Sequence, residues 1–252
     1  MSFDAHPRSS LIVALDFDSL SSAVRFATKI ADQVGMFKIG MQLFTAAGPQ
    51  AVKEVAALGP GIFLDLKFHD IPNTVAGAVL SAAAISGVQL MNVHALGGTA
   101  MLGAAVQSVN AVSAMGEDRP RLLAVTILTS MDQKSMREVG ISGLPKDRVL
   151  KLAKLAKRAG VDGVVASVQE ARAIRKACGR DFLIVTPGVR PAEPSDAGKK
   201  SHGKTDDQAR TATPTAAIRA GADFLVVGRP ILVAPDPRAA AQAIVEEIAA
   251  AK

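Results

Sequence analysis

Tryptophan and tyrosine are absent from the 252 residues of this chain, and phenylalanine occurs only nine times. Proteins that bind single-stranded nucleic acids use aromatic side chains as stacking platforms, so this scarcity argues against that class. The single cysteine, Cys178, excludes a disulfide within the chain. It follows two basic residues in an expected helix and lacks a nearby catalytic histidine pattern, so we expect an inert thiol.

Long apolar runs are also absent. No stretch approaches the roughly 18 residues that a membrane-spanning helix requires, and residues 1–10 lack the apolar segment of a secretion signal. We therefore expect a cytoplasmic protein with no membrane partner. The formal net charge is +6, which favours phosphorylated ligands or nucleic acid. We interpret it as attraction of a small-molecule substrate together with a basic loop, and we expect no nucleic-acid partner.

What the sequence does contain is an alternation of short apolar, β-branched runs with longer amphipathic, alanine-rich stretches. Such alternation predicts a parallel sheet with right-handed crossovers. Eight units in about 250 residues are typical of a closed (β/α)8 (TIM) barrel forming one domain over residues 1–252. The alternative is an open doubly wound sheet. The expected strands are 11–16, 36–39, 62–67, 89–94, 122–127, 163–166, 183–186 and 224–227, and expected helices include 19–33, 76–86, 149–158 and 239–251.

Polar residues gather where the expected strands end. In a barrel, these ends and the loops that follow them form one mouth, where active sites lie. A loop position explains any one of these residues but explains the whole set less well. The set comprises Asp16, Lys38, Asp65, Lys67, His94, Thr126, Thr129, residues 187–190, Gly228 and Arg229.

The densest group of polar residues spans positions 65–74. Asp65 and Lys67 are two residues apart, so on a regular strand they face the same side and form an adjacent anion and cation. Asp70 precedes a helix that Pro72 helps to start. Lys38 adds a second cation at the neighbouring strand end, and a lysine in an apolar strand is costly unless it is paired. The pattern indicates an alternating charge array, although a structural salt bridge would also produce it.

Two arginines follow the last two strands. Residues 185–191 form a tight turn that presents Arg190, and Gly228 and Arg229 follow the eighth strand. Glycine allows a ligand to approach the backbone, and arginine binds an oxyanion through two parallel hydrogen bonds. The loops after strands seven and eight are the usual phosphate site of such barrels. The pattern favours a phosphomonoester ligand, against the alternative of solvent-facing loop residues.

Residues 198–205 match the Walker A spacing in full. That motif requires a strand directly before it and a helix directly after it, whereas residues 191–195 contain two prolines and Asp206 and Asp207 follow. We interpret the match as accidental, in a loop that could cover a bound phosphate. An ATP-hydrolysing or nucleotide-sensing protein remains the alternative. His69 and His94 with Asp65 and Asp70 could be read as metal ligands, but no close histidine pair supports this, so we expect no metal.

With these residues in view, the chain resembles bacterial orotidine 5′-phosphate decarboxylases over about residues 11–230. The most specific segment is Phe63-Leu64-Asp65-Leu66-Lys67-Phe68-His69-Asp70-Ile71-Pro72-Asn73-Thr74. Further matching segments, in order, are Leu15-Asp16, Phe37-Lys38, Asn92-Val93-His94-Ala95, Val125-Thr126-Ile127-Leu128-Thr129-Ser130-Met131, Thr186-Pro187-Gly188-Val189-Arg190-Pro191, Asp207-Gln208 and Val227-Gly228-Arg229-Pro230.

The resemblance implies cofactor-free decarboxylation of orotidine 5′-monophosphate to UMP in a homodimer with shared sites. It implies that Asp65 lies beside the substrate carboxylate and that Lys67 donates the proton. Asp70 would reach into the other subunit's site, with Thr74 contacting ribose across the same interface. The remaining roles that the resemblance implies are ribose contacts from Asp16 and Lys38, pyrimidine contacts from Thr129 and Ser130, and phosphate contacts from Arg190, Gln208, Gly228 and Arg229.

The chain departs from the family pattern at residues 191–207, where a long basic loop replaces a shorter segment. Gln208 is therefore assigned from its Asp-Gln context and its distance to Gly228. The nearest alternative activity is a Mg²⁺-dependent sugar-phosphate decarboxylase or synthase on the same barrel, which would also carry the Asp65, Lys67 and Asp70 pattern.

Overall fold

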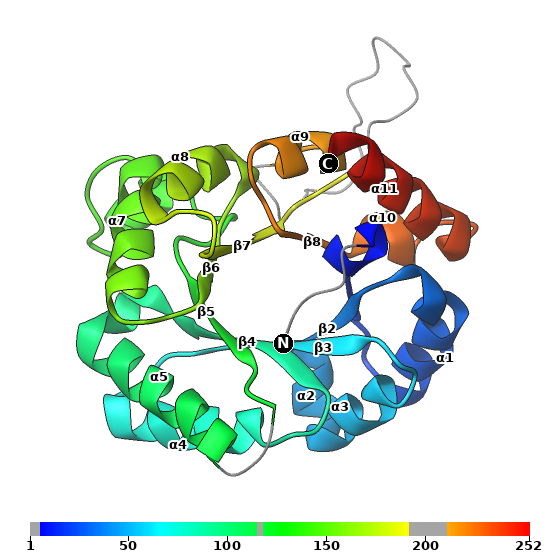
Figure 1. Cartoon of the computed structure of the whole chain (residues 1–252), viewed down its shortest axis with the longest axis horizontal. Helices are drawn as coiled ribbons and strands as arrows, with labels where there is room; N and C mark the ends of the chain where they lie inside the picture. The colour runs from blue at the N-terminus through cyan, green and yellow to red at the C-terminus, as the bar shows by residue number, and fades with distance from the viewer. Residues whose placement is uncertain (1–5, 115–117, 192–210) are drawn as a thin grey trace.

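The computed structural model describes residues 6–114, 118–191 and 211–252, and within them eight parallel strands close into a barrel in the order β1 to β8 (Figure 1). The sheet closes where β1 pairs with β8, with Leu11 opposite Leu225. This confirms the (β/α)8 barrel, and the open doubly wound sheet is wrong. The strands are β1 (Leu11–Ala14), β2 (Met36–Gly40), β3 (Gly61–Phe68), β4 (Val88–His94), β5 (Arg121–Val125), β6 (Gly163–Val165), β7 (Leu183–Pro187) and β8 (Phe224–Val227).

Helices surround the barrel and connect its strands (Figure 1). Several begin with proline, which lacks the N–H that the first helical turn leaves unpaired, and Pro72 starts its helix as the sequence predicts. The α-helices are α1 (Leu20–Ile30), α2 (Met41–Ala47), α3 (Pro49–Ala56), α4 (Pro72–Ala83), α5 (Gly98–Ala114), α6 (Gln133–Glu138), α7 (Pro145–Arg158), α8 (Val168–Cys178), α9 (Pro214–Arg219), α10 (Arg229–Leu232) and α11 (Pro237–Ala251), and three short 3₁₀ helices are η1 (Pro7–Ser10), η2 (Ala31–Gln33) and η3 (Ala95–Gly97).

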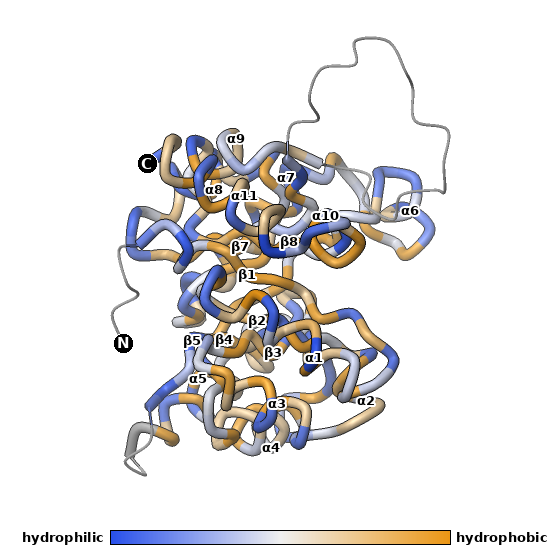
Figure 2. The backbone as a smooth tube through the Cα atoms, turned by 90° about the vertical axis from the view of Figure 1, so that its right-hand side faces the viewer, coloured by the Kyte–Doolittle hydropathy of each residue, from blue (hydrophilic) through white to orange (hydrophobic). Residues whose placement is uncertain are grey.

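Two apolar layers hold these elements together, and hydrophobic segments such as β1 lie at the centre of the molecule (Figure 2). Side chains alternate along each strand, so one set fills the barrel and the other packs against the helices. Ile12, Phe63 and Phe224 belong to the inner layer, whereas Val13 and Leu64 face the helices. The inner layer fills the barrel below its mouth, and a cavity lies at the carboxyl ends of the strands.

Among the described residues, no helix is both long and apolar enough to cross a bilayer. Cys178 lies on α8, as expected, and is buried. Burial raises the pKa of its thiol, which disfavours the reactive thiolate.

Arg175 of α8 stabilises the amino-terminal end of the barrel, opposite the cavity. Its guanidinium donates hydrogen bonds to the carbonyl oxygens of Gly179, Arg180, Phe182 and Gly221 and to the carboxylate of Asp223, at 2.6 to 3.2 Å. Asp223 also accepts the backbone N–H of Ile184 on β7 at 2.7 Å. Burial raises the pKa of Asp223, so its charge depends on this partner.

We expect Arg175→Ala to lower the free energy of unfolding by about 2–3 kcal/mol, because it leaves a half-buried carboxylate and several carbonyls without their donor. Urea denaturation followed by circular dichroism measures the change. Arg172→Ala, an exposed arginine on the same helix, is the matched control and should change stability by less than about 0.5 kcal/mol. Equal losses of unfolding free energy in the two variants would contradict this stabilising role of Arg175.

Candidate functional site

The barrel mouth contains a cavity of about 340 Å³, a size suited to a small ligand. The strand ends and the loops after them supply its walls. Nine residues that the sequence selects line it: Asp16, Lys38, Asp65, Lys67, Thr129, Ser130, Arg190, Gly228 and Arg229. Parallel strands bring all their carboxyl ends to one face, so residues from distant parts of the chain converge there.

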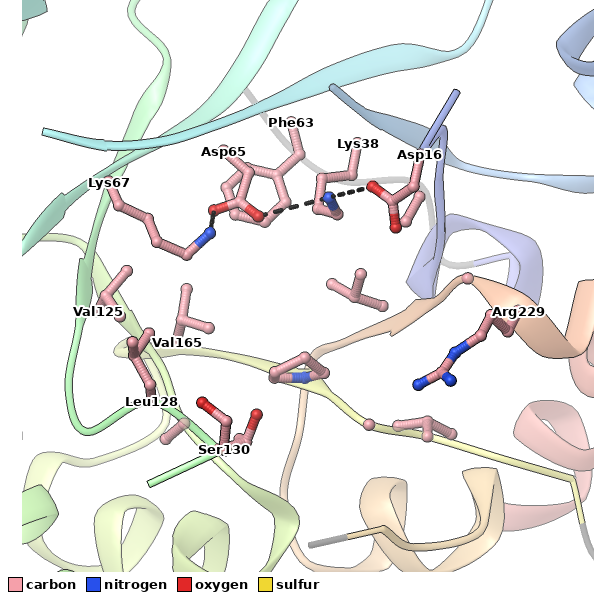
Figure 3. Close-up of a pocket in the computed structure, with 18 of the residues that line it drawn as sticks. Asp16, Lys38, Phe63, Asp65, Lys67, Val125, Leu128, Ser130, Val165 and Arg229 are labelled. Carbon is pink, nitrogen blue, oxygen red and sulfur yellow. Dashed lines mark hydrogen bonds and ion pairs between the residues drawn. The ribbon is translucent and has the colours of Figure 1, made fainter. Parts of the chain in front are cut away.

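Four charged side chains of alternating sign form a row along the wall made by β1, β2 and β3 (Figure 3). The ammonium of Lys67 lies 2.7 Å from one carboxylate oxygen of Asp65, and the ammonium of Lys38 lies 3.5 Å from the other. Lys38 also contacts Asp16 at 3.2 Å. The structure therefore brings together the predicted lysine and aspartate residues of these three strands, which we name the charge row.

Asp65 is the central member of the charge row and is 8% exposed. Burial by itself raises the pKa of this carboxyl, but the charges of Lys38 and Lys67 and the hydrogen bonds from Lys67 and Asn92 outweigh it and lower the pKa below its ordinary value. A buried carboxylate is stable when it is paired and hydrogen-bonded. Asp65 is therefore a fixed negative charge inside the cavity.

The backbone of Lys67 differs from the regular strand that the sequence predicts. A regular strand would place Asp65 and Lys67 on one face, but the register between β3 and β4 shifts between Ile62 and Phe63 and again between Leu64 and Phe68. Lys67 adopts φ = 53°, in the left-handed region. The expected regular alternation is wrong at this point, although the predicted contact between the two side chains is confirmed.

Asn92 of β4 lies in one of the segments that resemble the family, but the sequence alone assigns it no role. It is fully buried, donates to Asp65 at 2.6 Å and accepts the backbone N–H of Lys67 at 2.7 Å. The signal in the sequence is an amide inside the apolar run from Leu90 to Val93, since a buried amide requires partners. Which partners it has depends on β3 lying beside β4.

The two arginines lie at the ends of β7 and β8, and Arg229 lies across the cavity from the charge row (Figure 3). Gly188 adopts φ = 75°, a conformation that favours glycine in the turn before Arg190. A Cβ atom at Gly228 would make only ordinary contacts, at 3.6 Å to Ala14 and 3.7 Å to Asp16. Protein packing alone therefore does not require glycine at position 228, and close approach of a ligand remains our prediction for it.

A third part of the wall combines apolar and hydroxyl groups. Val125, Leu128 and Val165 line the cavity beside Ser130 (Figure 3), and Thr129 is buried next to them. A flat ring with polar edges fits such a surface, because the apolar side chains can pack on the ring while hydroxyls bond its edge.

Asp70 and Thr74 do not line the cavity of their own chain. Both are exposed, at the start of α4, and Asp70 accepts the backbone N–H of Ile71 at 2.6 Å. Ile71 is a large apolar side chain that is 65% exposed. Gln208 and most of the basic loop at 191–207, with its Walker-like string, lie outside the described residues.

His69 and His94 stack next to the charge row, with ring centroids 5.2 Å apart. His94 accepts the backbone N–H of Leu96 at 3.3 Å, which confirms the expected hydrogen bond at the end of β4. Burial, followed by the charges of His69 and Lys67, lowers the pKa of His94 to about 4. Within the described part of the chain, no cluster of three or more His, Cys, Asp or Glu side chains could hold a metal ion.

A closed parallel barrel whose mouth holds a row of lysines and aspartates and two arginines defines a (β/α)8-barrel enzyme for a small anionic substrate. A sequence model of the orotidine 5′-phosphate decarboxylase / HUMPS family matches residues 9–244. The chain belongs to this family.

Curated relatives agree with this assignment. The orotidine 5′-phosphate decarboxylase of Syntrophotalea carbinolica is 54% identical over 245 residues, covering 97% of this chain and 96% of the relative. That of Geotalea daltonii is 52% identical over 243 residues, covering 96% and 97%. The crystal structure of the orotidine 5′-phosphate decarboxylase from Lactobacillus acidophilus is similar at a TM-score of 0.81 and 40% identity, covering 94% of this chain and 98% of that one.

The lowered pKa of His94 predicts a pH dependence of stability. The unfolded chain protonates this histidine near pH 6.5, whereas the folded chain keeps it neutral until about pH 4. Its stabilising contribution is therefore complete above pH 6.5 and is lost as the pH falls toward 4. After discounting for partial exposure, we expect a loss of about 1 kcal/mol between pH 7 and pH 5.

Urea denaturation at the two pH values measures this loss, with His94→Asn as the comparison. Asparagine can still accept the N–H of Leu96 but does not titrate. The variant should lose less stability than the wild type over the same interval. Identical losses in the two proteins would mean that His94 does not titrate with a lowered pKa.

Proposed function

We propose that this chain decarboxylates orotidine 5′-monophosphate to UMP and CO₂ in pyrimidine biosynthesis, without a cofactor and with Lys67 as the proton donor. One observation carries the proposal: two lysines contact one buried aspartate in the cavity, and an arginine lies on the far side of that cavity. The curated relatives at 52–54% identity bear the name of this activity.

The chemistry explains why such a site is suitable. Loss of CO₂ from C6 of the pyrimidine leaves an electron pair in the ring plane, which the ring π-system delocalises poorly. A fixed cation placed where this charge develops is the remaining means of stabilisation. A pair of unit charges 4 Å apart interacts by roughly 4 kcal/mol at an effective dielectric of about 20. Lys67 supplies the cation and then transfers one proton to C6, which forms UMP.

Asp65 contributes in two ways. It holds the ammonium of Lys67 at 2.7 Å in the cavity, so the donor is positioned before the substrate arrives. Its ionised carboxylate also repels the substrate carboxylate, and this repulsion fades as CO₂ departs. We regard the second effect as secondary, because ground-state destabilisation is the weaker argument from a static geometry.

The remaining site residues bind the substrate away from the reacting carbon. Arg190, Arg229, Gly228 and Gln208 hold the phosphate, and binding at this remote group offsets the cost of bringing two carboxylates together. Asp16 and Lys38 contact the ribose. Thr129 and Ser130 contact the pyrimidine, with the apolar wall at Val125 and Val165 against the ring.

The position of Asp70 and Thr74 supports a homodimer with shared sites. Both residues are exposed at the start of α4, outside their own cavity, beside the exposed Ile71. In a symmetric dimer the same surface of each subunit meets the other, and it can carry Asp70 and Thr74 into the partner's cavity. We further propose one catalytic domain over residues 1–252, with a long basic loop at about 191–207, acting in the cytoplasm.

Lys67→Ala is expected to abolish turnover while leaving UMP affinity within a few-fold, because it removes the proton and the cation but not the phosphate contacts. The absorbance loss of orotidine 5′-monophosphate with chelator-treated protein measures turnover, and isothermal titration calorimetry measures UMP binding. Lys151→Ala, an exposed lysine of α7, is the control and should retain wild-type turnover. Near-normal turnover by Lys67→Ala would refute the role, and activity that requires added Mg²⁺ would favour the sugar-phosphate alternative.

Shared sites predict complementation between two inactive variants. Lys67→Ala and Asp70→Ala should each be inactive, but a mixed dimer contains one site with both native residues. Random reassembly of equal amounts should restore roughly a quarter of wild-type activity, because half of the dimers are mixed and each has one intact site of two. Turnover after co-refolding measures this. If turnover does not recover although analytical ultracentrifugation shows dimers, the active sites are not shared between the subunits.

A further inference from the structure

The backbone at Lys67 is unusual for a lysine. Among the described residues, Lys67 is the only non-glycine residue with a positive φ, at 53°. The five residues of β3 from Leu64 to Phe68 lie opposite only three residues of β4, from Met91 to Val93. A side-chain-bearing residue persists in this conformation only when its surroundings hold it there. Some neighbouring group must therefore hold the backbone of Lys67.

Asn92 is the group that holds this backbone. Its side-chain oxygen accepts the backbone N–H of Lys67 at 2.7 Å, and its side-chain nitrogen donates to Asp65 at 2.6 Å. It is 0% exposed, so no solvent competes for either bond. One rigid amide thus fixes both the backbone of the lysine and the carboxylate that this lysine contacts at 2.7 Å.

We infer that Asn92 is a positioning residue for the decarboxylation: it holds Lys67 in its left-handed conformation and orients Asp65, and so sets where the ammonium lies. This inference rests on the proposed function of Lys67. Asn92 does not line the cavity, so its effect is indirect. It should alter the chemical step without altering the affinity for phosphate-bearing ligands.

The first experiment is Asn92→Ala. Loss of the amide leaves the N–H of Lys67 without its acceptor and removes one donor from Asp65, so the ammonium shifts. A misplacement of about 1 Å costs roughly 10²-fold in rate. We expect kcat to fall by about that factor, with the Kd for UMP within a few-fold of wild type. An unchanged kcat, or a fall explained wholly by weaker binding, would overturn the inference.

Met91→Ala is the matched control. Met91 is the neighbouring residue on β4, equally buried, but it packs in the outer layer against the helices. It should lower Tm at least as much as Asn92→Ala, because truncation of a buried methionine creates a cavity, while kcat stays near the wild-type value. A similar loss of kcat in both variants would mean that general destabilisation, not positioning, explains the effect.

Asn92→Asp provides a pH readout that a merely structural role would not produce. The protonated carboxyl copies the amide, because its carbonyl accepts from Lys67 and its O–H donates to Asp65. Burial and the charge of Asp65 raise the pKa of the introduced carboxyl, whereas Lys67 and the more distant Lys38 oppose this. On the β5 side, Asn92 pairs with the apolar Leu123.

The ratio of kcat in Asn92→Asp to kcat in the wild type should therefore be highest at low pH and should fall as the pH rises through that pKa. A ratio that does not change between pH 5 and pH 9 would contradict the inference. Amide hydrogen exchange at Lys67 separates this test from the proposed function. Exchange should be at least tenfold faster in Asn92→Ala even if the wild-type chain fails to decarboxylate the nucleotide. Unchanged exchange would mean that Asn92 does not hold the backbone of Lys67.

Discussion

The ionised state of Asp65 is the condition on which the rest of the site depends. A carboxylate that is 8% exposed loses most of its hydration, and it keeps its charge only because two ammonium groups and an amide surround it. Those partners come from β2, β3 and β4, so the charge can form only after three strands have paired. The barrel therefore holds these charges in a fixed arrangement, so the proposed reaction needs little reorganisation when charge develops in the substrate.

This arrangement divides the cavity into regions with different physical tasks. The charge row lies on one wall and Arg229 on another. A substrate with a phosphate at one end and a carboxylate at the other can bind through the first group and experience strain at the second. In the proposed reaction, binding and chemistry are thereby separated in space, which allows affinity at the phosphate to be used for the reaction at C6.

The eight strands, the helix that begins at Pro72 and eight of the cavity residues could be predicted from the residues themselves, because they depend on local periodicity and on the rule that parallel strands end on one face. Ser130 follows from the family resemblance alone. Two features could not be predicted. Lys67 leaves regular strand geometry, and Asn92 bonds to Asp65 and to the backbone of Lys67. Both depend on the pairing of β3 with β4, which a local sequence pattern does not specify.

The sequence by itself determined the alternation of apolar strands with amphipathic helices and the placement of lysine, aspartate and arginine at the strand ends. Only the tertiary structure decided how those side chains are oriented. The bonds from Asn92 join residues 25 and 27 positions apart, and their formation requires the irregular register between β3 and β4. A buried polar group must find partners wherever the folded chain provides them, and the fold, not the local sequence, selects which partners those are.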